Sequence, residues 1–304
     1  MMETIHILGA GNIGCHLAFA LRNLRPHPPQ VTLLLRKNTI PTFKGKIICT
    51  HKGVTKNVEG VEAEESEGRD KGWIENLVIA TKTYQLLSAL QPLRERLDAR
   101  STVLLMMNGI PPPTATLFPD PESRPRCLSA VTTHGIFSTE RFCITLAGVG
   151  ELHFGPSSEL AGWFEEQLQR TGGIMVTGEE LRRRQVEKLT VNAAINPVSA
   201  LWGVKNGETM GIPEAVGVMR GVVKEVAEVE ELDETQLWRK VEEVAKMTKD
   251  NWSSMCQDLR AGRRTEVEEI NGWVVNRAKE MGKKCKVNEA LVERVREGEK
   301  MGER

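Results

Sequence analysis

Three polar side chains occupy one face of a predicted helix in the second half of the chain. Lys188, Asn192 and Asn196 are four residues apart, so successive members lie only about 40° apart around the helix axis. Apolar residues surround them, and asparagine is a poor helix former that usually occupies caps and turns. Two interpretations remain open: a buried polar network that holds two domains together, or the wall of an active site. In an active site, the lysine could donate a proton to a carbonyl while the amides hold a polar substrate.

A glycine-rich turn near the N-terminus favours the active-site interpretation. The short apolar run 4–8 is followed by Gly9-Ala10-Gly11-Asn12-Ile13-Gly14 and then by an amphipathic helical pattern. Strand, glycine turn and helix follow in the order of a dinucleotide-binding fold, in which phosphates bind at the helix N-terminus. Gly9 would allow the tight turn, Gly11 the approach of a pyrophosphate, and Gly14 close packing of helix and strand. Residues 9–14 are therefore predicted to bind a dinucleotide.

A cation follows the second predicted strand. The run 31–35 ends at Arg36-Lys37, where a site selective for NAD would place an acidic residue to bind the ribose 2′-hydroxyl. A guanidinium suits a 2′-phosphate, which it can bind with two parallel hydrogen bonds. Arg36 therefore favours NADPH as the cofactor. The alternative is that Arg36 is only a surface charge.

Polar residues follow the next two predicted strands as well. Lys82 and Gln85 come after the run 76–80, and Asn108 comes after the run 102–107. In an open parallel sheet the ligand lies at the carboxyl ends of the strands. These three residues are therefore predicted to lie where cofactor and substrate meet, although any one of them could be an ordinary loop residue.

The order of strand and helix patterns predicts two domains. The chain has 304 residues, enough for two domains of ordinary size. Short β-like runs between 127 and 154 are interpreted as further sheet of the first domain, and helical patterns dominate after about Glu179. We predict an α/β protein: a dinucleotide-binding domain at 1–178, followed by an all-helical substrate and catalytic domain at 179–304.

Composition argues against several other classes of protein. Lys+Arg and Asp+Glu number 41 each, so no overall field favours nucleic acid or an anionic membrane. The six cysteines show no CxxC pair, and the six histidines include no ligand pair such as HExxH, so no metal site and no disulfide framework is expected. The first predicted strand leaves no room for a signal peptide, and no apolar run could span a membrane. A cytoplasmic protein is expected.

A second cluster of candidate residues lies between 251 and 272. Gly262 is expected to end one helix, and Thr265 with Glu268 three residues later has the spacing of a capping box that opens the next. Glu266 would then be the first residue of that helix, where the helix dipole favours a carboxylate. Capping does not require Glu266, which is free to face a cleft.

At this point the sequence resembles the ketopantoate reductase (2-dehydropantoate 2-reductase) family, almost from end to end. The resemblance is carried, in order, by GAGNIG at 9–14, TKTYQ at 81–85, MNG at 107–109, TTHG at 132–135, KLTVNAAINPVSAL at 188–201, NGE at 206–208 and SSMCQDLRAGRRTEVEEINGWVV at 253–275. The last block is the most specific.

The resemblance implies a dinucleotide-binding domain, a helical C-terminal domain and an active site in the cleft between them. It implies reduction of the ketone of 2-dehydropantoate to (R)-pantoate with NADPH, in pantothenate and coenzyme A biosynthesis. Lys188 matches the general acid, Glu266 the active-site carboxylate, and Arg36 and Lys82 the contacts to the NADP phosphate. The positions that match substrate-binding residues are Asn108, Asn192, Asn196, Asn206 and Ser254. Burial among apolar neighbours should lower the pKa of Lys188 toward the working range of an acid catalyst.

The chain departs from the family pattern at Pro111-Pro112-Pro113, where the family usually has glycine and acidic residues. Proline fixes φ and removes N–H donors, so this loop is stiffer and offers fewer backbone donors to a substrate. One alternative is therefore a relative that reduces another 2-oxo acid, ketone or imine; a separate alternative is a non-catalytic NADPH-binding protein, against which the intact set of Lys188, Asn192 and Glu266 speaks. The expected partner is a small 2-oxo acid, and the expected assembly is a monomer or homodimer.

Overall fold

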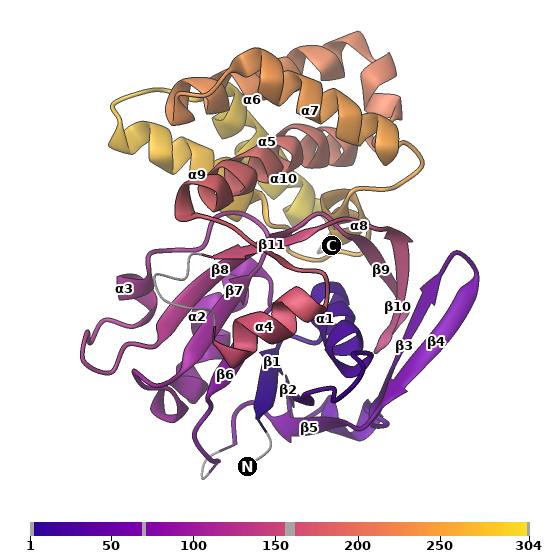
Figure 1. Ribbon diagram of the computed structural model, residues 1–304. Helices are drawn as coiled ribbons and strands as arrows, with labels where there is room; N and C mark the ends of the chain where they lie inside the picture. Colours follow the sequence, from indigo (N-terminus) through magenta and orange to yellow (C-terminus); the bar gives the residue numbers. More distant parts are fainter. Residues whose placement is uncertain (1–2, 69–70, 156–161, 303–304) are drawn as a thin grey trace. The chain divides into compact units, whose positions relative to one another are not determined.

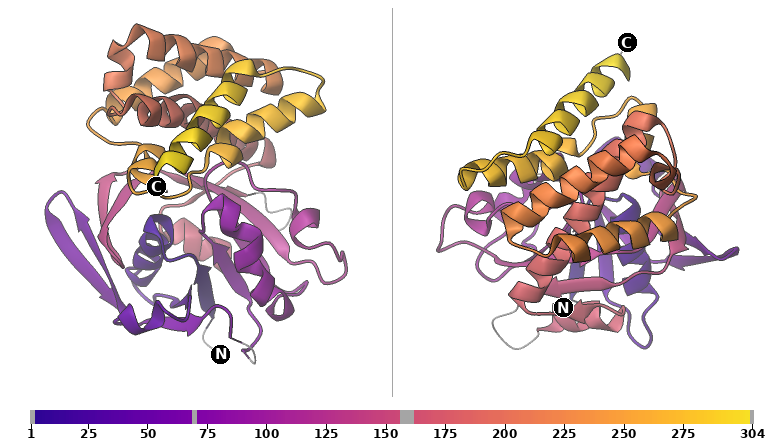
Figure 2. Two further views of the ribbon diagram at one scale, coloured as in Figure 1. Left: turned by 180° about the vertical axis from the view of Figure 1, so that it is seen from behind. Right: turned by 90° about the horizontal axis from the view of Figure 1, so that it is seen from above.

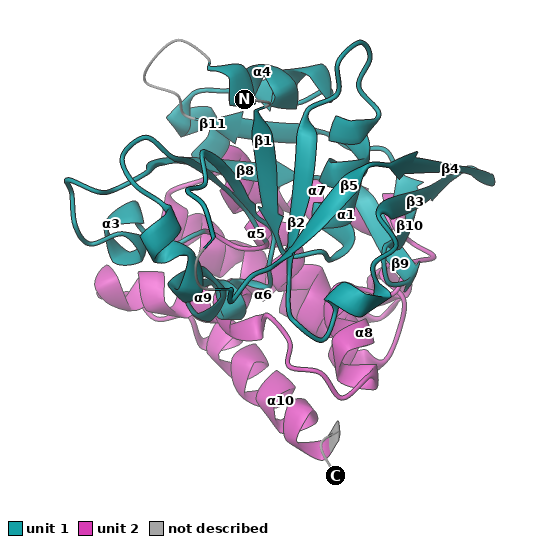
Figure 3. Cartoon of the chain, turned by 90° about the horizontal axis from the view of Figure 1, so that it is seen from below, with its two compact units in different colours: residues 1–107, 111–182 teal, residues 108–110, 183–304 magenta. Residues whose placement is uncertain are grey.

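The computed structural model describes residues 3–68, 71–155 and 162–302. The chain divides into two compact units, one made of residues 1–107 and 111–182 and the other of residues 108–110 and 183–304 (Figure 3). We call them unit 1 and unit 2. The long helix α5, Gly178–Trp202, begins at the domain boundary predicted near residue 178, and that boundary stays a prediction.

Within the described residues of unit 1, eight strands form a mostly parallel sheet in the order β12-β11-β8-β7-β6-β1-β2-β5 (Figure 1). The strands are β1 (Thr4–Leu8), β2 (Gln30–Leu35), β5 (Val61–Glu65), β6 (Asn76–Ile79), β7 (Thr102–Met106), β8 (Arg126–Thr132), β11 (Leu152–Gly155) and β12 (Ile174–Met175). The central strand β1 pairs in parallel with β2 and β6, with Ile7 opposite Leu33 on one side and Val78 on the other. The four strands predicted from apolar runs, β1, β2, β6 and β7, therefore form within one residue of the predicted ends.

A second sheet lies in the same unit. Its order is β4-β3-β10-β9, with β3 at Lys46–His51, β4 at Val54–Glu59, β9 at Gly135–Glu140 and β10 at Cys143–Gly148. The region 127–154 is sheet, as predicted, but its strands divide: β8 and β11 extend the main sheet, whereas β9 and β10 pair with each other and with β3. Strands β3 and β4 were not predicted; most residues of β4 are exposed and polar and show no buried alternation.

Apolar residues on both faces of the main sheet explain its position inside unit 1. Helix α1 (Asn12–Arg22) buries Leu17 and Leu21 in a core that also contains Leu33 of the main sheet and Ile47 of the second sheet. The opposite face packs against α2 (Leu86–Leu90), the 3₁₀ segment Gln91–Arg96 and α3 (Thr114–Leu117). Helix α1 thus contributes to a core shared with both sheets, and the glycine turn at its start is fixed by that packing.

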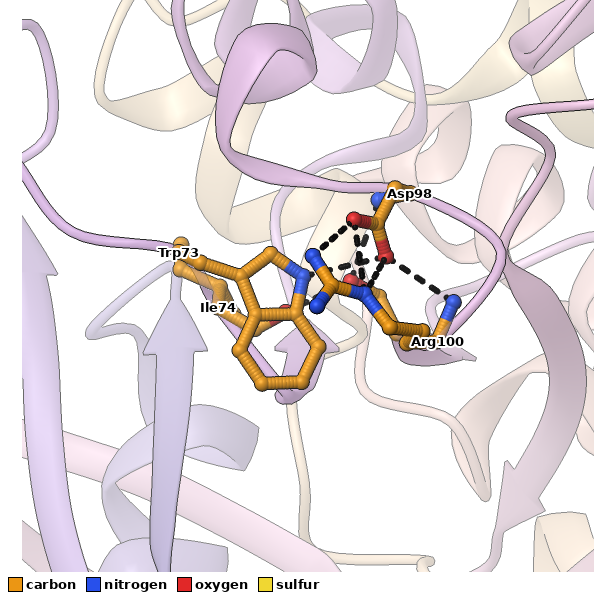
Figure 4. A network of polar contacts seen from close by, with 5 residues as sticks. Trp73, Ile74, Asp98 and Arg100 are labelled. Atoms are coloured by element: carbon orange, nitrogen blue, oxygen red, sulfur yellow. Dashed lines mark hydrogen bonds and ion pairs between the residues drawn. The ribbon is translucent and has the colours of Figure 1, made fainter.

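Polar contacts join the segment that leads into β6 to the segment that leads into β7 (Figure 4). The Trp73 indole N–H donates to Asp98 Oδ1 at 3.1 Å, and the Arg100 guanidinium lies 4.7 Å from the Trp73 ring centre while pairing with Asp98. Ser101 Oγ donates to the Ile74 carbonyl at 2.6 Å. Arg100 holds the pKa of Asp98 at about 2. These contacts lie at the amino ends of the two strands, away from their carboxyl ends.

Unit 2 is helical in its described residues. Its helices are the greater part of α5, then α6 (Pro213–Glu230), α7 (Glu234–Met247), α8 (Ser254–Arg260), α9 (Val267–Glu280) and α10 (Lys286–Gly302) (Figures 1 and 2). Helix α5 is buried on several sides, with Leu189, Ala193 and Val198 in one core together with Met219 of α6 and Val274 of α9. The all-helical C-terminal part is as predicted. No helix in the described ranges combines the length and apolar character needed to cross a membrane.

Candidate active site

The glycine turn of unit 1 has the geometry that a dinucleotide requires. Gly9 has φ of 102°, and a Cβ placed there would come within 2.7 Å of the Ala80 backbone. A Cβ on Gly14 would overlap the carbonyl oxygen of Gly9. A Cβ on Gly11, by contrast, would meet nothing within 4 Å, so the backbone at the N-cap of α1 faces open space. Gly9 and Gly14 therefore pack as expected from the sequence, whereas the approach of a pyrophosphate at Gly11, where it would meet the N–H groups of α1, stays a prediction.

Asn12, Ala10 and Ile13 complete that turn. The Asn12 side chain donates to the Ile136 carbonyl at 3.1 Å and accepts from the Ser138 hydroxyl. These two hydrogen bonds connect the turn to β9. Ala10 and Ile13 pack partly against the core of unit 1. A contact from these three residues to a cofactor would therefore come from their backbone.

The predicted cofactor residues beyond the glycine turn lie at neighbouring strand ends. Arg36 is exposed directly after β2, in a turn closed by the Thr39 N–H donating to the Arg36 carbonyl at 2.8 Å. Lys82 and Gln85 follow β6, where the Gln85 N–H donates to the Lys82 carbonyl at 2.9 Å. Because β1, β2 and β6 are parallel neighbours, these residues lie on the same edge of the sheet as the glycine turn.

Thr81 is a further candidate residue beside the glycine turn, and it was not among the predicted site residues. Its backbone N would lie 2.8 Å from a Cβ on Gly9, so it adjoins the glycine turn. Its Oγ1 is buried and has no hydrogen-bond partner among the described residues. The available signal was its place in the block TKTYQ at the end of a strand.

In unit 2, Asn108 joins the two predicted catalytic residues. Lys188 Nζ donates to Asn108 Oδ1 at 3.2 Å, and Asn108 Nδ2 donates to Glu266 Oε2 at 3.0 Å. Lys188 is half-buried on α5, and only 4% of Glu266 is exposed. The next residue, Gly109, has φ of 78°, and a Cβ there would come within 2.7 Å of the Glu269 carbonyl oxygen. The glycine thus lets this short segment pass close to α9, which places Asn108 between the other two side chains.

The surroundings of Lys188 favour an acid that can release its proton near neutral pH. Burial lowers the pKa of Lys188 from 10.5 to about 8, and the carboxylate of Glu266 opposes that change by raising the pKa. A buried ammonium loses hydration, which favours the neutral amine, whereas a nearby carboxylate favours the charged form. The pKa is therefore set by two opposing influences, of which burial is the larger.

Asn192 and Asn196 lie on α5 on the same face as Lys188. Asn192 is half-buried and Asn196 is 9% exposed. Neither side-chain amide makes a hydrogen bond to another described residue, although the Asn196 carbonyl accepts from Ser199 Oγ at 3.1 Å. Within the described structure the two amides therefore do not form the buried network that was one interpretation of this face.

Asn206 and Ser254 occupy different environments. Asn206 Nδ2 donates to Thr248 Oγ1 at 3.0 Å, while its Oδ1 is buried without a partner in the described part of the chain. Ser254 is exposed at the first position of α8, and its neighbour Ser253 caps that helix by accepting from the Cys256 N–H at 3.1 Å. Within the described ranges, no hydrogen bond joins Asn206 or Ser254 to Lys188 or Glu266. Among the described residues, hydrogen bonds therefore join Lys188, Asn108 and Glu266, but they do not connect Asn206 or Ser254 to these three.

The capping box predicted at the start of α9 is wrong. Thr265 Oγ1 accepts from the Val267 N–H at 3.2 Å, and the Thr265 N–H donates to Glu299 Oε1 at 2.7 Å instead of to Glu268. Glu268 pairs with Arg296. Both replacement partners belong to α10, so tertiary contacts displaced the local arrangement that the spacing suggested.

The position of Glu266 is also corrected by one residue. Helix α9 begins at Val267, and Glu266 is its N-cap residue rather than its first residue. Its side chain does not cap the helix; it accepts from Asn108 as described above. The predicted end of the preceding helix is confirmed, because Gly262 follows α8 with φ of 60°.

Two family models match successive parts of this chain. The model described as "Ketopantoate reductase PanE/ApbA" matches residues 5–159, and the model described as "Ketopantoate reductase PanE/ApbA C terminal" matches residues 180–299. The chain belongs to the ketopantoate reductase family. The predicted family, the α/β fold with a helical C-terminal part and the assignment as an oxidoreductase are thereby confirmed, and a nicotinamide dinucleotide is the cofactor class.

Sequence similarity between this ketopantoate reductase family member and its relatives covers most of the chain. A Schizosaccharomyces pombe protein named "Probable 2-dehydropantoate 2-reductase" is 30% identical, over 96% of this chain and 95% of its own. A 2-dehydropantoate 2-reductase of Salmonella typhi is 31% identical over 76% of each chain.

Solved structures share the fold. A PanE/ApbA family ketopantoate reductase from Ralstonia eutropha has a TM-score of 0.86 and 22% identity, covering 99% of this chain and all of its own. A D-mandelate dehydrogenase solved with NADH and anilino(oxo)acetate has a TM-score of 0.87 and 19% identity, over 99% of both chains. At these identities the likeness concerns the fold alone.

Proposed function

We propose that the protein reduces 2-dehydropantoate to (R)-pantoate with NADPH, a step toward pantothenate and coenzyme A. The observation that carries the proposal is the hydrogen-bonded chain from Lys188 through Asn108 to Glu266 in a member of this family. Such a chain presents a proton donor with a lowered pKa beside a carboxylate. Reduction of a ketone to an alcohol requires a hydride and a proton, and Lys188 can supply the proton.

Lys188 acts as the general acid. NADPH, when bound, supplies a hydride to the C2 ketone. Negative charge then develops on the ketone oxygen, and a donor directed at that oxygen lowers the barrier. Lys188 holds a proton at Nζ and transfers it to this oxygen, so that a C–H and an O–H bond form in the product. A pKa of about 8 makes the ammonium a better acid than ordinary lysine while keeping it protonated at neutral pH.

Asn108, Glu266 and the asparagines of α5 orient the reacting groups. Asn108 engages one N–H of the Lys188 ammonium, which leaves the remaining protons to be donated elsewhere. Glu266 holds the other end of the Asn108 amide and can accept from a substrate hydroxyl. Asn192 and Asn196 would bind the substrate carboxylate and hydroxyl without adding net charge. Asn206 and Ser254 are assigned to the substrate by their match to the family motif.

Unit 1 would bind NADPH through its glycine turn and the cations at its strand ends. The open approach at Gly11 suits the pyrophosphate, and Arg36 suits the 2′-phosphate because a guanidinium can bind it with two hydrogen bonds. Lys82 and Gln85 follow β6 on the same edge. The exposed Arg36 and the absence of an acidic residue in the segment 36–39 favour NADPH over NADH.

A second candidate is the reduction of a different 2-oxo acid by the same residues. Pro111-Pro112-Pro113 follow the segment that carries Asn108 and lead directly into α3, with Pro113 at its N-cap. Proline cannot donate a backbone hydrogen bond, so this loop offers a substrate fewer polar contacts than the glycine and acidic residues usual in the family. The change concerns the choice of substrate and leaves Lys188 and Glu266 in place.

Oxidation of NADPH with a panel of substrates tests the proposal. The panel contains 2-dehydropantoate, smaller and aromatic 2-oxo acids, a simple ketone and an imine, each assayed with NADPH and NADH. We expect the highest kcat/KM for 2-dehydropantoate with NADPH. A higher kcat/KM for another 2-oxo acid would favour the second candidate, and binding of NADPH without turnover of any compound would contradict both. The predicted cytoplasmic location and the monomeric or homodimeric state stay predictions.

A further inference from the structure

Pro197 removes one hydrogen bond from the interior of α5. Proline lacks an N–H, so the carbonyl four residues earlier loses its helical donor. That carbonyl belongs to Ala193, which is fully buried. A buried carbonyl without a donor is costly, and the helix nevertheless continues to Trp202.

Asn271 of α9 supplies the missing donor. Its Nδ2 donates to the Ala193 carbonyl at 3.0 Å and also to Asn288 Oδ1 at 3.0 Å. Asn288 in turn donates to Glu225 Oε2 at 2.8 Å. Asn271 and Asn288 are both 0% exposed and Glu225 is half-buried, so the polar connection from α5 to α6 is fully buried where it passes through α9 and α10.

The hydrogen bond between Asn271 and Ala193 lies at the same distance along α5 and α9 from the two candidate catalytic residues. Ala193 comes five residues after Lys188 on α5, and Asn271 comes five residues after Glu266, the N-cap residue of α9. At a rise of 1.5 Å per residue, the bond lies about 7.5 Å along each helix from the residue that bonds to Asn108. Within the core that α5 and α9 share, this hydrogen bond therefore ties the two helices together close to the point where Asn108 bridges Lys188 and Glu266.

We propose that Asn271 is a positioning residue, which uses the carbonyl freed by Pro197 to hold Lys188 and Glu266 at the separation that Asn108 spans. It does not touch the substrate. Its effect on the reaction rests on the proposed function, whereas its bond to Ala193 can be tested without any activity. Small displacements of reacting groups reduce rates strongly, so loss of this bond should affect kcat.

The first test is a double-mutant cycle in thermal stability. Asn271→Leu should lower Tm by about 2–10 °C, the scale for leaving a buried polar group unpaired in a chain of this size. In a Pro197→Ala background the new N–H at position 197 can donate to Ala193, so the loss from Asn271→Leu should be less than about half as large. Asn288→Leu is the matched control: it breaks the same buried connection without touching Ala193, and its loss should be equal in both backgrounds. An equal loss from Asn271→Leu in both backgrounds would overturn the assignment.

The second test separates positioning from stability. At a temperature well below Tm, Asn271→Leu should lower kcat by about tenfold to a hundredfold and leave the KM for NADPH within about twofold. Asn288→Leu, which also loses stability, should keep kcat within about threefold of wild type. Equal falls in kcat for the two variants, or an unchanged kcat in Asn271→Leu, would refute a positioning role. If Asn271→Leu does not fold, Asn271→Ser replaces it with the same comparisons. An inactive wild type would defeat the proposed function while leaving the stability cycle to decide on the bond.

Discussion

Lys188 Nζ donates a hydrogen bond to Asn108 Oδ1 at 3.2 Å. The two residues are 80 positions apart in the sequence, and the contact places the ammonium at the end of a chain that continues to Glu266. The lysine is therefore oriented by a neutral amide, which does not add a charge of its own to the site. The pKa of Lys188 then depends on its burial and on the more distant carboxylate.

Two alanine substitutions in the glycine turn should have opposite consequences. Gly11→Ala places its Cβ in open space on an extended backbone that alanine adopts, so Tm should change by no more than about 2 °C. Because the cofactor would approach at that position, the Kd for NADPH should rise by about tenfold or more. Gly14→Ala would overlap the Gly9 carbonyl and should destabilise the whole of unit 1. Calorimetry and cofactor titration check both, and unchanged NADPH affinity in Gly11→Ala would count against the assigned phosphate site.

Cofactor preference should depend on Arg36. Arg36→Ala should weaken NADPH binding by about 1.5–3 kcal/mol, the scale of a charge-assisted hydrogen bond, and leave NADH binding unchanged. Lys82→Ala should act in the same direction but more weakly. Lys44→Ala, another cation in unit 1, serves as a control and should affect neither cofactor. Equal losses for NADPH and NADH in Arg36→Ala would mean that the residue supports the structure instead of reading the 2′-phosphate.

Substrate affinity should depend on the amides of α5. Asn192→Ala should reduce kcat/KM for the 2-oxo acid, and it should leave NADPH affinity near wild type because the cofactor phosphates would bind unit 1. Its Tm should change little, because the Asn192 amide has no hydrogen-bond partner to lose among the described residues. Asn196→Ala should do the same with a larger fall in Tm, since Asn196 is more buried. Steady-state kinetics with melting curves tests this. A large fall in Tm with unchanged kinetics would restore the interpretation of this face as a structural network.

The rate should decline as pH rises through the pKa of Lys188. The protonated form is the active acid, and burial has lowered its pKa from 10.5 to about 8, so activity should be constant below that value and fall above it. Glu266 raises this pKa, so Glu266→Gln should move the decline to lower pH, whatever happens to the maximal rate. Profiles of kcat/KM against pH measure the shift. A decline that moves to higher pH in Glu266→Gln would be incompatible with the proposed electrostatics.

Local patterns in the sequence predicted the parts of this protein that depend on local structure. The glycine turn, the apolar strands of the main sheet and the helix face of Lys188 follow from spacing and residue type alone. Strands β3 and β4 of the second sheet were not predicted: β4 is largely exposed, and β3 buries only Ile47 and Cys49, on a face that packing against other segments creates. The capping box failed because Glu299 and Arg296 of α10 provide partners that local spacing cannot reveal.

The hydrogen-bonded chain of the site was predicted only in part. Lys188, Asn108 and Glu266 could each be singled out, but their bonds join segments that are 80 and 158 residues apart in the sequence. The role of Asn271 is similar, because the missing N–H of Pro197 can be read from the sequence whereas the donor that replaces it comes from α9.

The single-turnover rate of NADPH oxidation by Lys188→Ala, with saturating 2-dehydropantoate, decides whether Lys188 is the proton donor of the reaction. As general acid, Lys188 should be worth about 10²–10⁴ in rate, so the variant should lose that much while still binding NADPH. Lys188→Arg should not recover the rate, because a guanidinium cannot release its proton near neutral pH. A Lys188→Ala variant that keeps most of the wild-type single-turnover rate would show that Lys188 is not the general acid.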